Sequence, residues 1–171
     1  MGVHAAHRLS GFDYTGPHTY SVTCCTFPRR RWFTDSSTVE AVRLALLQSC
    51  QAEGFVVLAY CFMPDHVHLL VEGTSAASDL RRTVVSWKQK TGYEHRSKTG
   101  SALWQGGCYD HILREEEDRP EVVKYLIENP IRAGLVSAVN EYPFWGSGIC
   151  SRAELIETLF DQPDIHPEGN R

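Results

Sequence analysis

The order of the predicted strands and helices indicates an α+β protein in which helices pack on one face of an antiparallel sheet. Short stretches rich in β-branched and aromatic residues predict strands, and longer stretches with apolar residues three or four positions apart predict helices. Two of the strands are separated only by a short turn. Because a short turn joins only antiparallel strands, we expect an antiparallel sheet.

The first half of the chain supplies three strands and one helix. Residues 19–27 are β-branched and aromatic and predict the first strand. Residues 34–54 begin with N-cap side chains and continue with helical spacing. The apolar stripe of that helix consists of Val39, Val42, Leu46 and Leu47. Residues 55–62 and 66–71 predict two strands of a hairpin, broken around Pro64.

The second half alternates helix and strand. Residues 78–93 predict a helix with one apolar and one basic face, and residues 103–113 predict a fourth strand. Residues 115–129 predict a third helix, stopped by Pro130, and residues 153–160 a short last one. The order strand, helix, hairpin, helix, strand, helix is that of a ferredoxin-like sandwich.

Length and composition indicate one domain. The chain has 171 residues, of which 42% are hydrophobic and 22% charged. We expect a flexible N-terminal arm at residues 1–15, the domain at 16–148, and a short helix and tail at 149–171. The sequence has no apolar run long enough for a membrane span and no apolar stretch typical of a secretory signal. We therefore expect a cytoplasmic protein without membrane contact.

Cysteine usage and charge narrow the class further. Cysteines occupy positions 24, 25, 50, 61, 108 and 150 without a Cys-x-x-Cys pair. In a reducing compartment we expect them to be small buried side chains rather than a disulfide or zinc framework. The net charge of −4 argues against non-specific coating of nucleic acid. Residues 79–98 nevertheless carry six Lys and Arg side chains against two acidic ones, which is compatible with a local basic groove.

Two residue pairs could carry chemistry. His66 and His68 are two positions apart in a predicted strand, so their side chains share a face, where they could bind one metal ion or form a hydrogen-bonded structural pair. Tyr125 and Asn129 are four positions apart in a predicted helix and also share a face. Taken alone, their spacing favours an ordinary half-buried aromatic residue and a helix terminator before a proline.

The two pairs together resemble one family, the HUH-type single-tyrosine transposases and in particular the REP-associated tyrosine transposases. Four segments within residues 18–148 carry the resemblance: residues 60–73 with Pro64-Asp65-His66-Val67-His68, Leu103-Trp104-Gln105 through Tyr109-Asp110-His111, residues 124–136 with Asn129-Pro130, and Tyr142-Pro143-Phe144-Trp145. A lone His-x-His is weak evidence, whereas the joint order and spacing are specific.

The resemblance implies an HUH active site on the ferredoxin-like sheet. It implies His66 and His68 as metal ligands, Asn129 as the third ligand or a polar support, and Tyr125 as the nucleophile. The ion would be Mg²⁺ or Mn²⁺, although nitrogen and oxygen ligands suit zinc equally. The implied reaction is cleavage and strand transfer of single-stranded DNA beside REP-like hairpins through a 5′-phosphotyrosine. A nucleoid-associated monomer or homodimer is expected.

DNA contacts are expected outside the catalytic residues. The candidate phosphate contacts are Arg81, Arg82, Lys88 and Lys90, and the candidate stacking surfaces are Trp87, Trp104 and Tyr109. Core packing is an equal alternative for each aromatic residue. Gly107-Cys108 departs from the basic lead-in that the resemblance implies before Tyr109.

Two other functions fit parts of the pattern. A domesticated protein could bind DNA hairpins without cutting them, although the presence of His66, His68 and Tyr125 argues against this. A zinc hydrolase could use Cys61, His66 and His68, but no acidic residue closely follows His68 to activate water.

Overall fold

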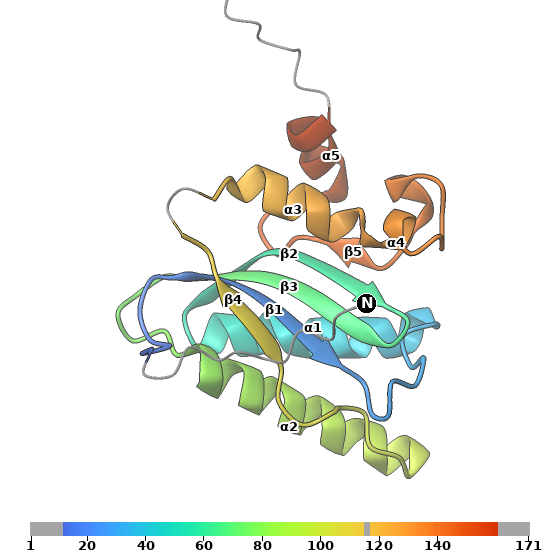
Figure 1. The fold of residues 1–171 in the computed structure, drawn as a ribbon. Helices are drawn as coiled ribbons and strands as arrows, with labels where there is room; N and C mark the ends of the chain where they lie inside the picture. Colours follow the sequence, from blue (N-terminus) through green and yellow to red (C-terminus); the bar gives the residue numbers. More distant parts are fainter. Residues whose placement is uncertain (1–11, 115–116, 161–171) are drawn as a thin grey trace, which may run out of the picture.

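A five-stranded antiparallel sheet forms the centre of the computed structural model, which describes residues 12–114 and 117–160 (Figure 1). The strands lie side by side in the order β4-β1-β3-β2-β5. Their bounds are β1 Thr19–Cys25, β2 Phe55–Met63, β3 His66–Gly73, β4 Tyr109–Ile112 and β5 Trp145–Gly146. The α+β class and the antiparallel sheet are confirmed.

Helices cover both faces of this sheet (Figure 1). Their bounds are α1 Ser36–Ala52, α2 Leu80–Thr99, α3 Arg119–Ile127, α4 Asn129–Arg132 and α5 Arg152–Phe160, with a 3₁₀ turn at Val139–Glu141. One face, here called the α1/α2 face, packs against α1 and α2, and the opposite one, the α3 face, packs against α3. The prediction that helices pack on one face holds for α1 and α2 and is wrong for α3. Because β2 is apolar along its whole length, both of its faces must be shielded from solvent by other elements.

The hairpin of β2 and β3 fixes which residues point to each face. Met63 is paired with His66 and Cys61 with His68. Val67, Leu69 and Val71 belong to the core under α1 and α2, whereas Leu70 belongs to the core under α3. Because side chains alternate along a strand, His66 and His68 lie on the α3 face with Leu70.

Element boundaries differ from the sequence prediction at several places. The predicted fourth strand is shorter, and an isolated bridge from Thr26 to Trp104 replaces its first part. The third helix begins at Arg119 rather than 115, and residues 115–116 lie outside the described residues. The two-residue strand β5 is absent from the sequence prediction, since two residues give no detectable alternation.

The termini modify the predicted domain limits. Residues 1–11 of the predicted arm and residues 161–171 of the predicted tail lie outside the described residues. Within the described part of the arm, Tyr14 is buried and Thr15 forms a bridge to Asp79. The prediction of a loose arm is therefore wrong for these two residues. In the described ranges, every helix is too short or too polar to cross a membrane.

One cysteine pair contradicts the expectation of free thiols. Cys24 on β1 and Cys108, just before β4, form a disulfide across 84 positions of sequence. The antiparallel pairing of β1 with β4 brings these two segments together, with the Cα atoms 4.7 Å apart. Cys25, Cys50, Cys61 and Cys150 are free, and the first three are buried, as expected.

Candidate active site

The two candidate ligand histidines lie at the start of β3. His66 Nε2 and His68 Nε2 are 3.0 Å apart, and the planes of the two rings make an angle of 89°. The other nitrogen of each ring, Nδ1, contacts a side chain that is not part of the histidine pair. His66 Nδ1 lies 2.6 Å from an Asp65 carboxylate oxygen, and His68 Nδ1 lies 2.9 Å from the Thr23 hydroxyl.

Electrostatics keep His68 neutral. Its pKa is lowered to about 4, first by burial and then by the nearby His66 and Arg29, against the opposing effect of Asp65. A neutral imidazole that donates Nδ1–H keeps a lone pair on Nε2. When both rings donate outward, to Asp65 and to Thr23, two lone pairs face each other. A cation between them removes that repulsion, so the donor set fits a divalent metal ion.

Asp65 and Thr23 are site residues that the sequence prediction missed. A carboxylate or hydroxyl that holds the outer nitrogen of a ligand histidine fixes its ring orientation and its tautomer. Asp65 is itself held, because its carboxylate lies 3.4 Å from Arg29 Nε and its backbone carbonyl accepts from Thr26. The acidic residue directly before His66 was an available signal, whereas Thr23 lies 45 positions from His68 on another strand.

Tyr125 projects from α3 on the same side of the sheet as the histidines. The residue is 59% exposed. The Arg132 guanidinium lies 4.1 Å from the centre of its ring and also donates to the Glu128 carboxylate, at 3.0 Å. A cation at this position can pair with a phosphate group attached to the phenol. Arg132 is a further residue that the sequence prediction missed.

The Lys124 side of α3 faces α5, because Lys124 lies 4.7 Å from the Phe160 ring of α5. Tyr125 follows Lys124 by about 100° around the helix, and its side chain lies largely in solvent.

Asn129 lies four residues beyond Tyr125 and is the first residue of α4, so the predicted single helix ends two residues earlier than expected, at Ile127. The Asn129 amide nitrogen donates to the carbonyls of Tyr125, at 3.2 Å, and Leu126, at 3.0 Å. These bonds fix the amide plane and leave the side-chain oxygen for another partner. Within residues 12–114 and 117–160, no cluster of three His, Cys, Asp or Glu side chains is arranged to hold a metal.

Cys61 lies opposite His68 but is a poor metal ligand. Its side chain is fully buried, and its thiol contacts Met63 Sδ at 4.0 Å. Burial raises the pKa of Cys61 to about 12, so the thiol keeps its proton at neutral pH. Because zinc binds the thiolate, this environment disfavours the zinc hydrolase that the sequence left open.

Comparison with known proteins identifies the family. The model of the IS200-like transposases matches residues 15–130, a span that contains His66, His68 and Tyr125. The chain belongs to the IS200-like transposase family. This match confirms the resemblance drawn from the four sequence segments.

Individual relatives of this transposase agree with the family. A Haemophilus influenzae protein assigned to the REP-associated tyrosine transposases is 23% identical over 171 residues, covering 92% of this chain and 96% of its own. The REP-associated tyrosine transposase of Escherichia coli K12 is 26% identical over 108 residues, covering 61% of this chain and 62% of its own. The solved structure of a REP-associated tyrosine transposase bound to a REP hairpin superimposes with a TM-score of 0.66 at 22% identity, covering 77% of this chain and 78% of that one. This last likeness confirms the fold.

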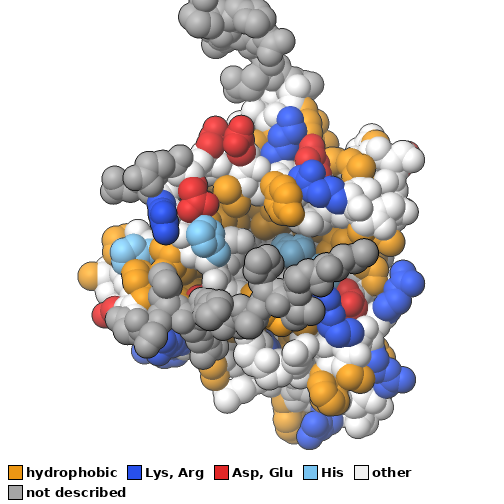
Figure 2. Space-filling model, viewed as in Figure 1, with side chains coloured by type: hydrophobic (Ala, Val, Ile, Leu, Met, Phe, Trp, Pro, Cys, Tyr) orange, Lys and Arg blue, Asp and Glu red, His pale blue; other side chains and the backbone are white. Residues whose placement is uncertain are grey.

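The four candidate phosphate contacts of the transposase lie on α2, on the opposite side of the sheet from the histidines. Figure 2 shows Lys and Arg side chains spread over the lower part of the molecule, where α2 lies. Arg82 pairs with Glu53, and Lys90 donates to the Gln48 side chain at 2.9 Å. Lys88 donates to the carbonyls of the loop before β4. The structure therefore separates this basic helix from the histidine pair.

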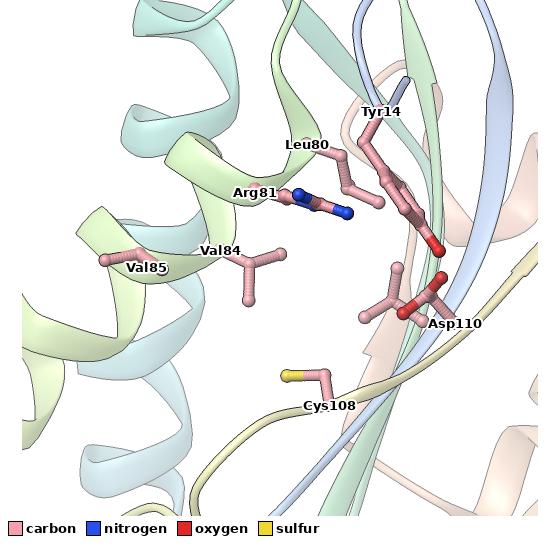
Figure 3. Close-up of a pocket in the computed structure, with 8 residues that line it drawn as sticks. Tyr14, Leu80, Arg81, Val84, Val85, Cys108 and Asp110 are labelled. Atoms are coloured by element: carbon pink, nitrogen blue, oxygen red, sulfur yellow. The ribbon is translucent and has the colours of Figure 1, made fainter. Parts of the chain in front are cut away.

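Arg81 lines a cavity between α2 and the edge of the sheet. The cavity has a volume of about 160 Å³ and lies between Leu80, Val84 and Val85 on α2 and Asp110 on β4. Figure 3 shows the Arg81 side chain extending toward the Tyr14 ring, whose centre is 4.6 Å from the guanidinium. Because Asp110 points to the α1/α2 face, this cavity is on the opposite side of the sheet from the histidines.

The three candidate stacking residues occupy different environments. Trp87 is fully buried and donates its indole N–H to the Val42 carbonyl, so its prediction as a stacking surface is wrong. Trp104 packs between Trp87 and Phe33 and donates to the Thr91 hydroxyl. Tyr109 is 37% exposed. Among the three, Tyr109 alone lies on the α3 face.

Proposed function

We propose that this transposase cleaves and rejoins single-stranded DNA beside hairpin elements through a covalent 5′-phosphotyrosine. The observation that carries the proposal is the facing pair of imidazole nitrogens, on the same side of the sheet as the helix that carries the exposed Tyr125. The family match supports DNA processing. A solved relative of similar fold is bound to a REP hairpin, which supports a hairpin as the partner.

Tyr125 is the proposed nucleophile. Its phenolic oxygen attacks the scissile phosphorus, the bond from phosphorus to the 3′-oxygen breaks, and the leaving oxygen takes up a proton to become a 3′-hydroxyl. The phenolic oxygen gives up its proton as it bonds to phosphorus. Arg132, whose guanidinium lies 4.1 Å from the centre of the ring, is close enough to pair with the phosphate that becomes attached to Tyr125. Attack by another 3′-hydroxyl on the phosphotyrosine reverses the step and joins a new strand.

His66, His68 and Asn129 are the proposed ligands of a divalent ion, Mg²⁺ or Mn²⁺. When bound, such an ion polarises a phosphate oxygen and offsets the charge that develops in the transition state. With the Nδ1–H of each ring donated to Asp65 and to Thr23, both Nε2 lone pairs are free for the ion. The amide of Asn129 is kept in place by its bonds to the end of α3.

Substitution of Tyr125 by Phe tests the proposal. The wild-type protein, incubated with Mn²⁺ and a 3′-end-labelled hairpin with single-stranded flanks, is expected to retain the label through denaturing electrophoresis. Tyr125→Phe removes the attacking oxygen and abolishes this adduct, while hairpin affinity measured by fluorescence anisotropy is retained. Tyr93→Phe is the matched control, since Tyr93 is 76% exposed on α2 and should leave the adduct unchanged.

The outcomes separate the proposal from the non-cleaving alternative. An adduct that persists in Tyr125→Phe refutes the assignment of the nucleophile. Tight hairpin binding by the wild-type protein without any adduct, in Mg²⁺ and in Mn²⁺, supports a hairpin-binding protein that has lost cleavage.

A further inference from the structure

We propose that Tyr109 stacks on the base of an unpaired nucleotide next to the scissile phosphate and thereby positions the strand at the histidine pair. This inference rests on the proposed function and deepens it, because it gives the DNA strand a place on the sheet. Stacking on an aromatic ring accepts any base, so the residue sets position rather than sequence.

One row of side chains connects Tyr109 with the histidines. Tyr109 on β4 is directly opposite Thr23 on β1, and Thr23 is directly opposite His68 on β3. Opposite residues of antiparallel strands project to the same face of a sheet. Because the Thr23 hydroxyl contacts His68 Nδ1 at 2.9 Å, all three side chains share the α3 face. Two strand spacings, or about 10 Å, separate the two ends of the row.

The part of the α3 face that carries this row is open in the described residues. Helix α3 packs chiefly against β2 and β3. In the middle of this open half, the side chains of β1 and β4 on this face are exposed or half-exposed, namely Ser21, Thr23, Tyr109 and His111, whereas Thr19 and Cys25 at the two ends of β1 are buried. Figure 2 shows histidine side chains at the surface just below α3. A DNA strand lying on this open half reaches both the histidines and the side of α3 that carries Tyr125.

Charge places the base at Tyr109 rather than farther along β4. His111, the next residue of β4 on this face, lies 2.9 Å from the Glu117 carboxylate. The Arg114 backbone N–H also holds that carboxylate, and these bonds keep the pKa of Glu117 below its usual value. A carboxylate held there repels the phosphate backbone, with His111 and Arg114 offsetting part of its charge. The strand is therefore expected to pass Tyr109 and turn toward His68.

Coupling between Tyr109 and a single base is the test. Binding is measured with the Tyr125→Phe protein, which does not cleave, and hairpins in which one base at a time beside the cleavage site is replaced by an abasic nucleotide. Tyr109→Ala is expected to weaken binding of the intact hairpin roughly tenfold, within the range for loss of one aromatic stack. On the hairpin that lacks the stacked base, Tyr109→Ala should cause no further loss.

Two control variants keep the test decisive. Tyr109→Trp retains a ring and is expected to restore affinity, which a general disturbance of the short strand β4 would prevent. Tyr93→Ala removes an exposed tyrosine from α2 and should weaken all hairpins equally or not at all. If Tyr109→Ala lowers the affinity for every abasic hairpin by the same factor as for the intact hairpin, the inference is overturned. This test measures binding and not cleavage. If one abasic position cancels the effect of Tyr109→Ala but the wild-type protein forms no adduct, the stacking proposal stands and only the proposed cleavage is overturned.

Discussion

The two faces of the sheet differ in how completely helices cover them. On the α1/α2 face, large side chains such as Phe33, Leu46 and Trp87 are almost entirely excluded from solvent. On the α3 face, helix cover lies mainly over β2 and β3, and polar side chains occupy the rest. The sealed face holds most of the buried apolar side chains, and the half-open face carries the proposed catalytic residues.

The same strand takes part in both faces, and this explains how the histidines are held. Val67 and Leu69 are buried in the α1/α2 core, and His66 and His68 alternate with them on β3. Packing on one side therefore fixes the backbone positions of the polar residues on the other. Functional groups on a strand anchored in this way are placed more precisely than groups on a loop.

The largest expected effect comes from the sealed face. Trp87→Ala removes a fully buried indole and leaves the Val42 carbonyl without its donor. We expect the free energy of unfolding to fall by about 3–5 kcal/mol, as measured by urea denaturation. Tyr125→Ala removes an exposed aromatic side chain from the other face and should change it by less than about 0.5 kcal/mol. An equal fall in the free energy of unfolding for both variants would show that the α1/α2 face does not contribute more to stability than the α3 face.

On the half-open face we expect a smaller effect, and on metal affinity rather than on stability. Asp65→Asn keeps the shape of the side chain that holds His66 but removes its charge. We expect Mn²⁺ affinity, measured by calorimetry, to fall about 10- to 100-fold, the range for loss of a partner of a ligand histidine. Glu40→Gln, an exposed carboxylate on α1 that pairs with Arg43, is the matched control. Unchanged Mn²⁺ affinity in Asp65→Asn would remove Asp65 from the site.

The sequence predicted the parts of this arrangement that depend on local periodicity. The shared face of His66 and His68 follows from a period of two, and the neighbouring positions of Tyr125 and Asn129 follow from the helical period. The face of the sheet that α3 covers could not be predicted, because the apolar run of β2 serves both faces alike. Thr23 and the Cys24–Cys108 disulfide depend on the register of β1 with β3 and β4, which no local pattern specifies.

The smallest expected effect concerns the basic helix α2. Its candidate phosphate contacts test whether the α1/α2 face takes part in the reaction. Arg82 is largely exposed and pairs with Glu53, so Arg82→Ala should change the free energy of unfolding by at most about 1 kcal/mol. As a predicted phosphate contact, Arg82 should contribute to hairpin affinity for all sequences alike, and its loss should reduce the slope of log affinity against log salt by about one.

Glu53→Gln separates these two roles of Arg82. It breaks the same ion pair but keeps the arginine, so it should reproduce the change in stability and leave the salt slope intact. Because α2 and the histidines lie on opposite sides of the sheet, neither variant should change the rate of adduct formation at saturating hairpin. A lower saturated rate in Arg82→Ala would mean that α2 acts on the scissile strand itself. The two faces would then have to be treated as one catalytic surface that the DNA encloses from both sides.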